Sequence, residues 1–277
     1  MIGLALLIVI SSIILFYIIG NTILSIFSNE TYRNEYASVL SKCITGLLLS
    51  VFLCASIITR GNTVLWGCIV VALLYLTLYY KEKYTINNIK CFFNEKEITP
   101  LVIILSLGII SFSYQAYHFY NEPYNNIPHE DYGFYGILGE LMTEHHTEST
   151  IFTNDIFSES KAATPYHYFD SWMGVLLSEI FRINNVESLY MCAYPVLFAL
   201  YSFSIITIAK LFTSNIFFQI CSLATLCFMP VTWFDFTRPL KDIIIEPAFW
   251  GYHALVTPKT LIIALLSAYT IIAFFNN

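Results

Sequence analysis

Acidic and imidazole side chains are concentrated in one part of this chain, residues 118–188. This block holds eleven Asp or Glu residues against two Lys or Arg, and it lies between long apolar segments. It also holds His129, His145, His146 and His167 out of six histidines, with His118 at its edge. Carboxylates and imidazoles can act as general bases or bind a divalent metal. We therefore expect the chemistry of this chain to lie in the block.

Two short polar groups within the block are the strongest candidates. His129, Glu130 and Asp131 follow closely on an apolar segment, and His167 and Asp170 open a second helical pattern. A structural alternative stays open, because acids in the first turn of a helix are stabilised by the helix dipole without any catalytic role.

The histidine spacing does not predict a tight metal site. The block contains no HExxH motif, and His145 and His146 are adjacent, so they do not share one face of a helix. We predict no structural metal.

The composition predicts a membrane protein. Hydrophobic residues make up 57% of the chain and charged residues 12%, well below the roughly 25% of a soluble domain. The mean hydropathy is +0.67. The net charge of −6 gives no indication of nucleic-acid binding. The seven cysteines lack metal-ligand spacing, and six of them fall in apolar segments, which indicates packing residues.

Apolar runs long enough to cross a bilayer recur along the chain. They predict an all-α, polytopic transmembrane protein with about seven spans and amphipathic interfacial helices in a large outer loop. The first run lacks a basic start and a small-residue cleavage site, so we interpret it as a retained helix. The predicted spans are residues 2–27, 37–59, 62–80, 100–118, 189–211, 215–234 and 258–275.

The orientation follows from the positive-inside rule. The loop between the third and fourth spans carries Lys81, Lys83, Lys90 and Lys96, which predicts that it is cytoplasmic. Lys42 and Lys210 then fall on the same side. The N-terminus, the 118–188 block and the 235–257 loop are predicted to lie outside, in a membrane that we expect to be bacterial and cytoplasmic.

Two amphipathic helices are predicted within the outer block, lying in the interface with their apolar faces toward lipid. The first covers Pro128–His146, and its apolar stripe is Phe134, Ile137, Leu138, Leu141 and Met142. The second begins with Thr164 as N-cap and Pro165 at the first helical position. Its stripe is Met173, Leu176, Leu177 and Ile180.

The segments HEDYGFYG (129–136) and YHYFDSW (166–172), set in an outer loop with two interfacial helices, resemble a known family. They are similar to those of the multi-spanning glycosyltransferases of the GT-C fold, which use polyprenyl-phosphate-linked sugars. The resemblance covers about residues 100–260. It implies an N-terminal three-span unit (1–99), with its lysine-rich cytoplasmic loop, and a GT-C-like region (100–277).

The resemblance implies sugar transfer from a polyprenyl-phosphate donor to an acceptor hydroxyl on the outer face. Asp131 matches the family's catalytic base, and Glu130 or His129 would assist it or contribute to a divalent cation site. His167 and Asp170 match a looser polar pattern expected to contact substrate. The motif follows the fourth span here rather than the first, and the spans are few, so the chain could be the N-terminal part of a longer protein.

Cations and an aromatic residue complete the expected site. Arg238 and Lys241, in the second outer loop, are candidates for the donor phosphate, because a guanidinium matches phosphate oxygens. Snorkelling at helix ends is an equally good explanation of both. Trp172 could stack on a sugar, although Trp more often anchors a membrane interface.

Three other functions remain open on the sequence. A surface-polysaccharide polymerase or ligase would use similar lipid-linked substrates. A transporter would usually carry ionisable residues near mid-membrane and repeat symmetry, which this sequence lacks. A non-catalytic membrane subunit would explain the excess of acid without any reaction.

The cation assignment predicts that Arg238→Gln and Lys241→Gln weaken donor binding, because each removes a positive charge from the leaving phosphate. The measurement is the affinity of the full chain for a labelled polyprenyl-phosphate sugar. Unchanged affinity in both variants would show that neither residue binds the phosphate.

Overall fold

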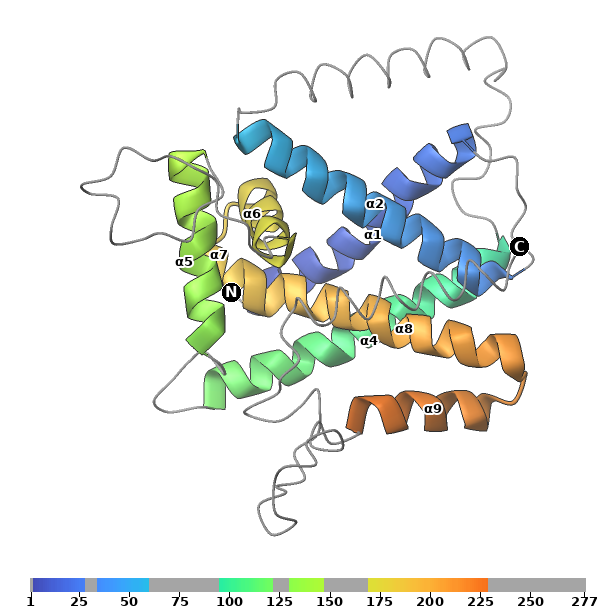
Figure 1. Ribbon diagram of the computed structural model, residues 1–277. Helices are drawn as coiled ribbons and strands as arrows, with labels where there is room; N and C mark the ends of the chain where they lie inside the picture. Colours follow the sequence, from blue (N-terminus) through green and yellow to red (C-terminus); the bar gives the residue numbers. More distant parts are fainter. Residues whose placement is uncertain (1, 28–33, 60–94, 122–129, 147–168, 229–277) are drawn as a thin grey trace, which may run out of the picture.

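The computed structural model describes residues 2–27, 34–59, 95–121, 130–146 and 169–228. All secondary structure in these residues is helical, as predicted. Figure 1 shows the arrangement. The helices, in order, are α1 (Ile2–Phe27), α2 (Glu35–Ile58), α4 (Glu95–Asn121), α5 (Glu130–His145), α6 (Phe169–Phe181), α7 (Asn185–Glu187), the π-helix η2 (Ser188–Ala193), α8 (Tyr194–Phe212) and α9 (Ile216–Phe228).

Four helical segments are long and apolar enough to cross a membrane: Ile2–Ser25, Glu35–Ile58, Glu95–Tyr117 and the continuous run Asn185–Phe212. They match four predicted spans, and they indicate that the chain is integrated in a membrane. The predicted total of about seven is not confirmed. The spans at 62–80 and 258–275 lie outside the described residues, and the one at 215–234 is described only as the shorter α9.

The third of these helices begins earlier than the sequence predicts. The predicted span begins at about residue 100. In the structure α4 starts at Glu95, so Pro100 lies inside it and the charged residues Glu95, Lys96 and Glu97 belong to the helix. Of these three residues, Glu95 and Lys96 are exposed and Glu97 is buried, so Glu97 brings charge into the bundle at that end.

The end of α1, the starts of α2 and α4 and the end of α8 meet at one end of the bundle. Lys42 of α2 lies 2.7 Å from Glu97 of α4, and Lys210 of α8 lies 3.4 Å from Glu35 of α2. Lys210 also stands 3.3 Å from the centre of the Tyr36 ring. The helix directions therefore agree with the predicted alternation of spans. The compartment that this end faces stays a prediction.

Two glycines bring the backbones of α1 and α2 together. A Cβ atom placed on Gly20 would lie 1.7 Å from the carbonyl oxygen of Lys42, and one on Gly46 would lie 1.9 Å from that of Phe16. No side chain fits in such a space. Small residues at helix crossings allow this approach in membranes, where packing rather than water exclusion drives helix association. The crossing is visible in Figure 1.

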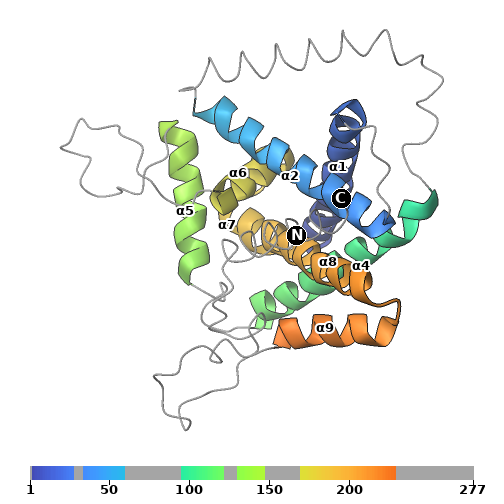
Figure 2. The same cartoon turned by 45° about the vertical axis from the view of Figure 1, so that its right-hand side comes forward.

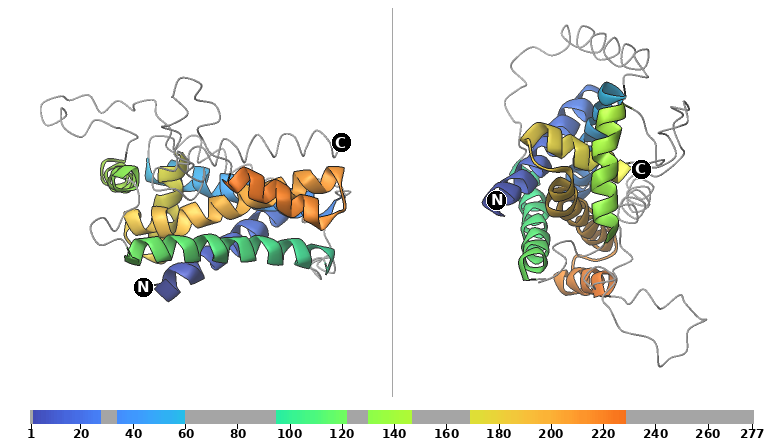
Figure 3. Two further views of the ribbon diagram at one scale, coloured as in Figure 1. Left: turned by 90° about the horizontal axis from the view of Figure 1, so that it is seen from below. Right: turned by 90° about the vertical axis from the view of Figure 1, so that its left-hand side faces the viewer.

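At the opposite end of the bundle, α5 lies across the long helices. Figure 3 (left) shows α5 end-on beside the ends of α4 and of the α7–η2–α8 run. In Figures 1 and 2, α6 lies between α5 and α2. An interfacial helix at this position was predicted, and its bounds of Glu130–His145 agree with the sequence pattern.

The buried face of α5 differs from the predicted stripe. The stripe is expected to face lipid, but Leu138 and Met142 are buried among the other helices, whereas Phe134 and Ile137 are 39% and 53% exposed. Tyr135 is buried in their place. The face turned toward the bundle includes glycines, which a search for apolar side chains does not count.

The apolar stripe of α6 packs inside the protein. Met173, Leu176 and Leu177 are buried among the other helices, and only Ile180 is exposed. The expectation that this stripe faces lipid was therefore wrong, because α6 is enclosed between α5, η2 and α2 instead of lying on the surface. Its predicted N-cap at Thr164 and Pro165 lies outside the described residues.

We predict that Gly46→Val destabilises the protein by about 1–3 kcal/mol or more, because the added side chain has to separate two backbones. The measurement is thermal unfolding in detergent. Gly3→Val is the matched control, since a Cβ there meets nothing within 4 Å. Equal melting temperatures for both variants would contradict the crossing.

Candidate functional site at the α5–α6 end

The predicted catalytic acids lie at the start of α5. Glu130 and Asp131 form part of its first helical turn, where the backbone N–H groups have no partners within the helix. An acid at this position is favoured by the helix dipole, so its occurrence there fits either a catalytic or a purely stabilising role. His129 lies just outside the described residues.

The predicted substrate-binding residues fall into two groups. Asp170 and Trp172 lie on α6 and are 1% and 3% exposed, so both side chains are enclosed within the protein. His167, Arg238 and Lys241 lie outside the described residues. The sequence correctly placed Asp170 near the start of a helix, but it did not predict that this helix is buried.

The packing of α5 on its neighbours depends on two glycines. A Cβ on Gly136 would lie 2.4 Å from Cγ2 of Val186 and 2.8 Å from its Cα, so α5 and α7 pack closely there. A Cβ on Gly139 would lie 3.0 Å from Cγ2 of Val175 on α6. The start of α5 is therefore positioned by a contact that lies within two turns of Asp131.

The described contacts do not bring the acids of α5 and α6 into one pair. The two helices touch at Gly139 and Val175, and α6 runs across α5 in Figure 3 (right). Asp131 precedes that contact by eight residues, or about 12 Å of helix, and Asp170 precedes it by five, or about 8 Å. Asp131 therefore lies along α5, and Asp170 along α6, each away from the point where the two helices cross.

The π-helix η2 joins this end to the spanning helices. Pro195 follows η2 and has no N–H group, so a regular helix would lose a hydrogen bond there, and a widened turn before it relieves the strain. The Ser188 hydroxyl donates to the carbonyl oxygen of Gly174 on α6 at 2.6 Å. The Tyr190 hydroxyl donates to that of Gln115 on α4 at 3.3 Å. These bonds fix α6 and α4 against the same turn.

A metal site is not formed by the described part of the chain. In those ranges no group of three His, Cys, Asp or Glu side chains could hold an ion. His129, which the resemblance implies as a contributor to a cation site, and His167 lie beyond the ranges covered.

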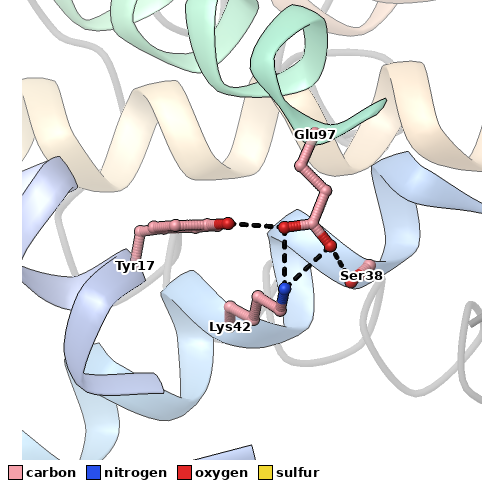
Figure 4. Close-up of polar contacts among 4 residues, drawn as sticks. All are labelled: Tyr17, Ser38, Lys42 and Glu97. Atoms are coloured by element: carbon pink, nitrogen blue, oxygen red, sulfur yellow. Dashed lines mark hydrogen bonds and ion pairs between the residues drawn. The ribbon is translucent and has the colours of Figure 1, made fainter. Parts of the chain in front are cut away.

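The most connected polar cluster lies at the other end of the bundle, and the sequence did not predict it. Glu97 of α4 accepts hydrogen bonds from Tyr17 of α1 at 2.5 Å and from Ser38 of α2 at 2.7 Å (Figure 4). The Lys42 ammonium lies 2.7 Å from each carboxylate oxygen. The Tyr17 side chain is fully buried, and Glu97 and Ser38 are nearly so.

The geometry of this cluster indicates a clamp rather than a reactive site. Each oxygen of Glu97 accepts two bonds, which is about the full capacity of a carboxylate. The positive charge of Lys42 balances its negative charge at the same place. A saturated carboxylate has no lone pair left for a ligand or a transferred proton. The cluster therefore joins α1, α2 and α4.

Sequence reasoning missed the cluster because its partners are far apart along the chain. Lys42 was interpreted only as an orientation signal, and Glu97 was placed in a loop before the span. Yet a lysine inside an apolar run and an acid at the mouth of another are the two charges that a membrane bundle has to pair. That signal was present in the sequence.

Comparisons with known proteins give no relative of this chain. No family model, no curated protein and no solved structure matches it.

We predict that Lys42→Met costs about 3–5 kcal/mol of folding free energy, because it leaves the buried Glu97 carboxylate without its counter-charge. The double variant Lys42→Met/Glu97→Leu should recover most of that loss, since no charge then remains. The measurement is unfolding of all variants under one condition. A double variant less stable than Lys42→Met would contradict the charge pairing.

Proposed function

We propose that this protein is an integral membrane glycosyltransferase. It transfers a sugar from a polyprenyl-phosphate donor to an acceptor hydroxyl on the extracytoplasmic face. The observation that carries the proposal is α5, a helix with an acidic first turn that lies across one end of a bundle of membrane-spanning helices. The resemblance of the 129–136 segment supports the same reaction class.

The position of α5 suits a lipid-linked substrate. The polyprenyl tail of such a donor lies in the bilayer, and its phosphate and sugar lie at the interface with water. A helix that lies across the end of the bundle is at the depth of the phosphate and the sugar. Its outer face is apolar in the first half, with Phe134 and Ile137 exposed, and charged in the second, with Glu140 and Glu144 exposed. Such a helix can border lipid and water together.

The proposed reaction needs one base and one stabilised leaving group. The Asp131 carboxylate takes the proton of the acceptor hydroxyl, whose oxygen forms a bond to the anomeric carbon of the sugar. The bond from that carbon to the phosphate oxygen breaks, and polyprenyl phosphate leaves with the electron pair. Arg238 and Lys241 are proposed to balance the charge on the phosphate. Glu130 or His129 assists the base.

Asp170 and Trp172 take no part in this step as it is proposed. Both side chains are enclosed, so contact with a sugar would require α6 to leave the core. Their burial favours a role in holding α6 against its neighbours.

We predict that Asp131→Asn lowers sugar transfer by about 100-fold or more, the usual effect of losing a general base. The measurement is transfer from labelled polyprenyl-phosphate sugars in membranes that contain the full-length protein. Glu144→Gln is the matched control, because it removes an exposed acid from the other end of α5.

Equal transfer by wild type and Asp131→Asn would remove Asp131 from the mechanism. No transfer by the wild-type protein, tested with several donors, would reject the proposed reaction.

A further inference from the structure

We infer that Gly136 is a positioning residue for Asp131, and that its contact with Val186 sets where the acidic end of α5 stands. This inference rests on the proposed function, because it concerns the same site. Gly136 is not one of the residues that the resemblance assigns to the reaction.

The approach at Gly136 is the tighter of the two glycine approaches of α5. A Cβ there would meet both a side-chain methyl of Val186, at 2.4 Å, and its backbone Cα, at 2.8 Å. Rotation of the valine side chain cannot relieve the second approach. Any larger residue at position 136 therefore has to move one helix away from the other. The equivalent approach at Gly139 stops at 3.0 Å from a side-chain methyl of Val175, with the Asn185 side chain at 3.7 Å, and meets no backbone atom that close.

The partner of Gly136 is held firmly. Val186 lies in α7, whose start is capped by the Asn184 side chain, which accepts from the Val186 N–H at 2.8 Å. The same helix continues into η2, where the Ser188 hydroxyl is bonded to Gly174. Buried side chains flank position 136 on both sides, with Tyr135 before it and Leu138 and Met142 after it. A group added at position 136 therefore moves this part of α5 as a unit, and the start of the helix moves with it.

The size of that displacement can be derived from the distances. Ordinary packing begins at 3.4 Å, so the backbone approach at 2.8 Å requires a shift of about 0.6 Å even if the valine rotates, and the methyl approach at 2.4 Å requires about 1 Å if it does not. Asp131 is five residues closer to the helix start, about 7.5 Å along the axis, and it moves with the helix. A misplacement of about 1 Å can lower a reaction rate by about 100-fold. The Asp131 carboxylate would be present but out of place.

The test is a set of variants assayed for sugar transfer and for thermal unfolding. Gly136→Ala is expected to lower kcat by about 10- to 100-fold with little change in KM. Gly139→Ala, which requires a smaller shift, should lower kcat less. Gly3→Ala should have no effect, because nothing lies within 4 Å of a Cβ there. Val186→Gly removes the valine methyl but leaves the backbone of α7 in place, so Gly136→Ala/Val186→Gly should recover part of kcat.

To distinguish positioning of Asp131 from a purely structural role, the Gly136→Ala change is repeated in a protein that lacks the catalytic base. In an Asp131→Asn background, Gly136→Ala should leave the residual rate unchanged, because the group that it misplaces is already absent. A further equal loss in that background would overturn the inference. So would full kcat in Gly136→Ala with a lowered melting temperature, which would show that the contact affects stability alone.

The proposed function and the inference fail in different ways. If the wild-type protein transfers no sugar, the proposed function is rejected and the positioning role with it. The packing contact would still be verified if substitutions at positions 136 and 186 changed the melting temperature in a coupled, non-additive way. If the wild-type protein is active and Asp131→Asn is not, but Gly136→Ala keeps full kcat, only the positioning role is rejected.

Discussion

The close backbone approach between α1 and α2 is the constraint on which the rest of the bundle depends. Gly20 lies against the carbonyl of Lys42, and Gly46 lies against that of Phe16. Because the crossing is this close, Tyr17 and Lys42 stand next to each other, with the ammonium 5.4 Å from the centre of the Tyr17 ring. Glu97, which lies on α4, can then accept hydrogen bonds from both side chains. One steric feature therefore positions the buried charge pair of Lys42 and Glu97.

The same principle recurs at the opposite end, where Gly136 and Gly139 let α5 lie against α7 and α6. The two ends nevertheless differ in their electrostatics. At the first end, an acid is saturated by donors from two other helices and serves packing. At the second end, acids occupy the first turns of α5 and α6, each away from the point where these two helices cross. The saturated acid serves packing at the first end, and the proposed reaction belongs to the second end.

Hydropathy was sufficient to predict the helical class and four spans, because bilayer thickness fixes the length of an apolar run. It did not predict which stripe faces protein: α6 carries the expected apolar residues but turns them inward, and α5 packs through glycines that carry no hydropathy signal. In the candidate site, the sequence correctly placed Asp131 in the first turn of one helix and Asp170 near the start of another. The burial of Asp170 and the pairing of Lys42 with Glu97 depend on tertiary contacts across many residues, which periodicity cannot register.

The distance of Glu97 from Lys42 along the chain has a consequence during biosynthesis. The two residues are 55 positions apart, and chains grow at about 5–20 residues per second, so Lys42 is made roughly 3 to 11 seconds before its partner. During that interval the nascent helix pair holds a cation without its carboxylate. A lysine near the end of a span can meanwhile extend its ammonium toward the headgroups. The arrival of α4 then withdraws this charge from the lipid surface, so α4 completes the insertion of α1 and α2.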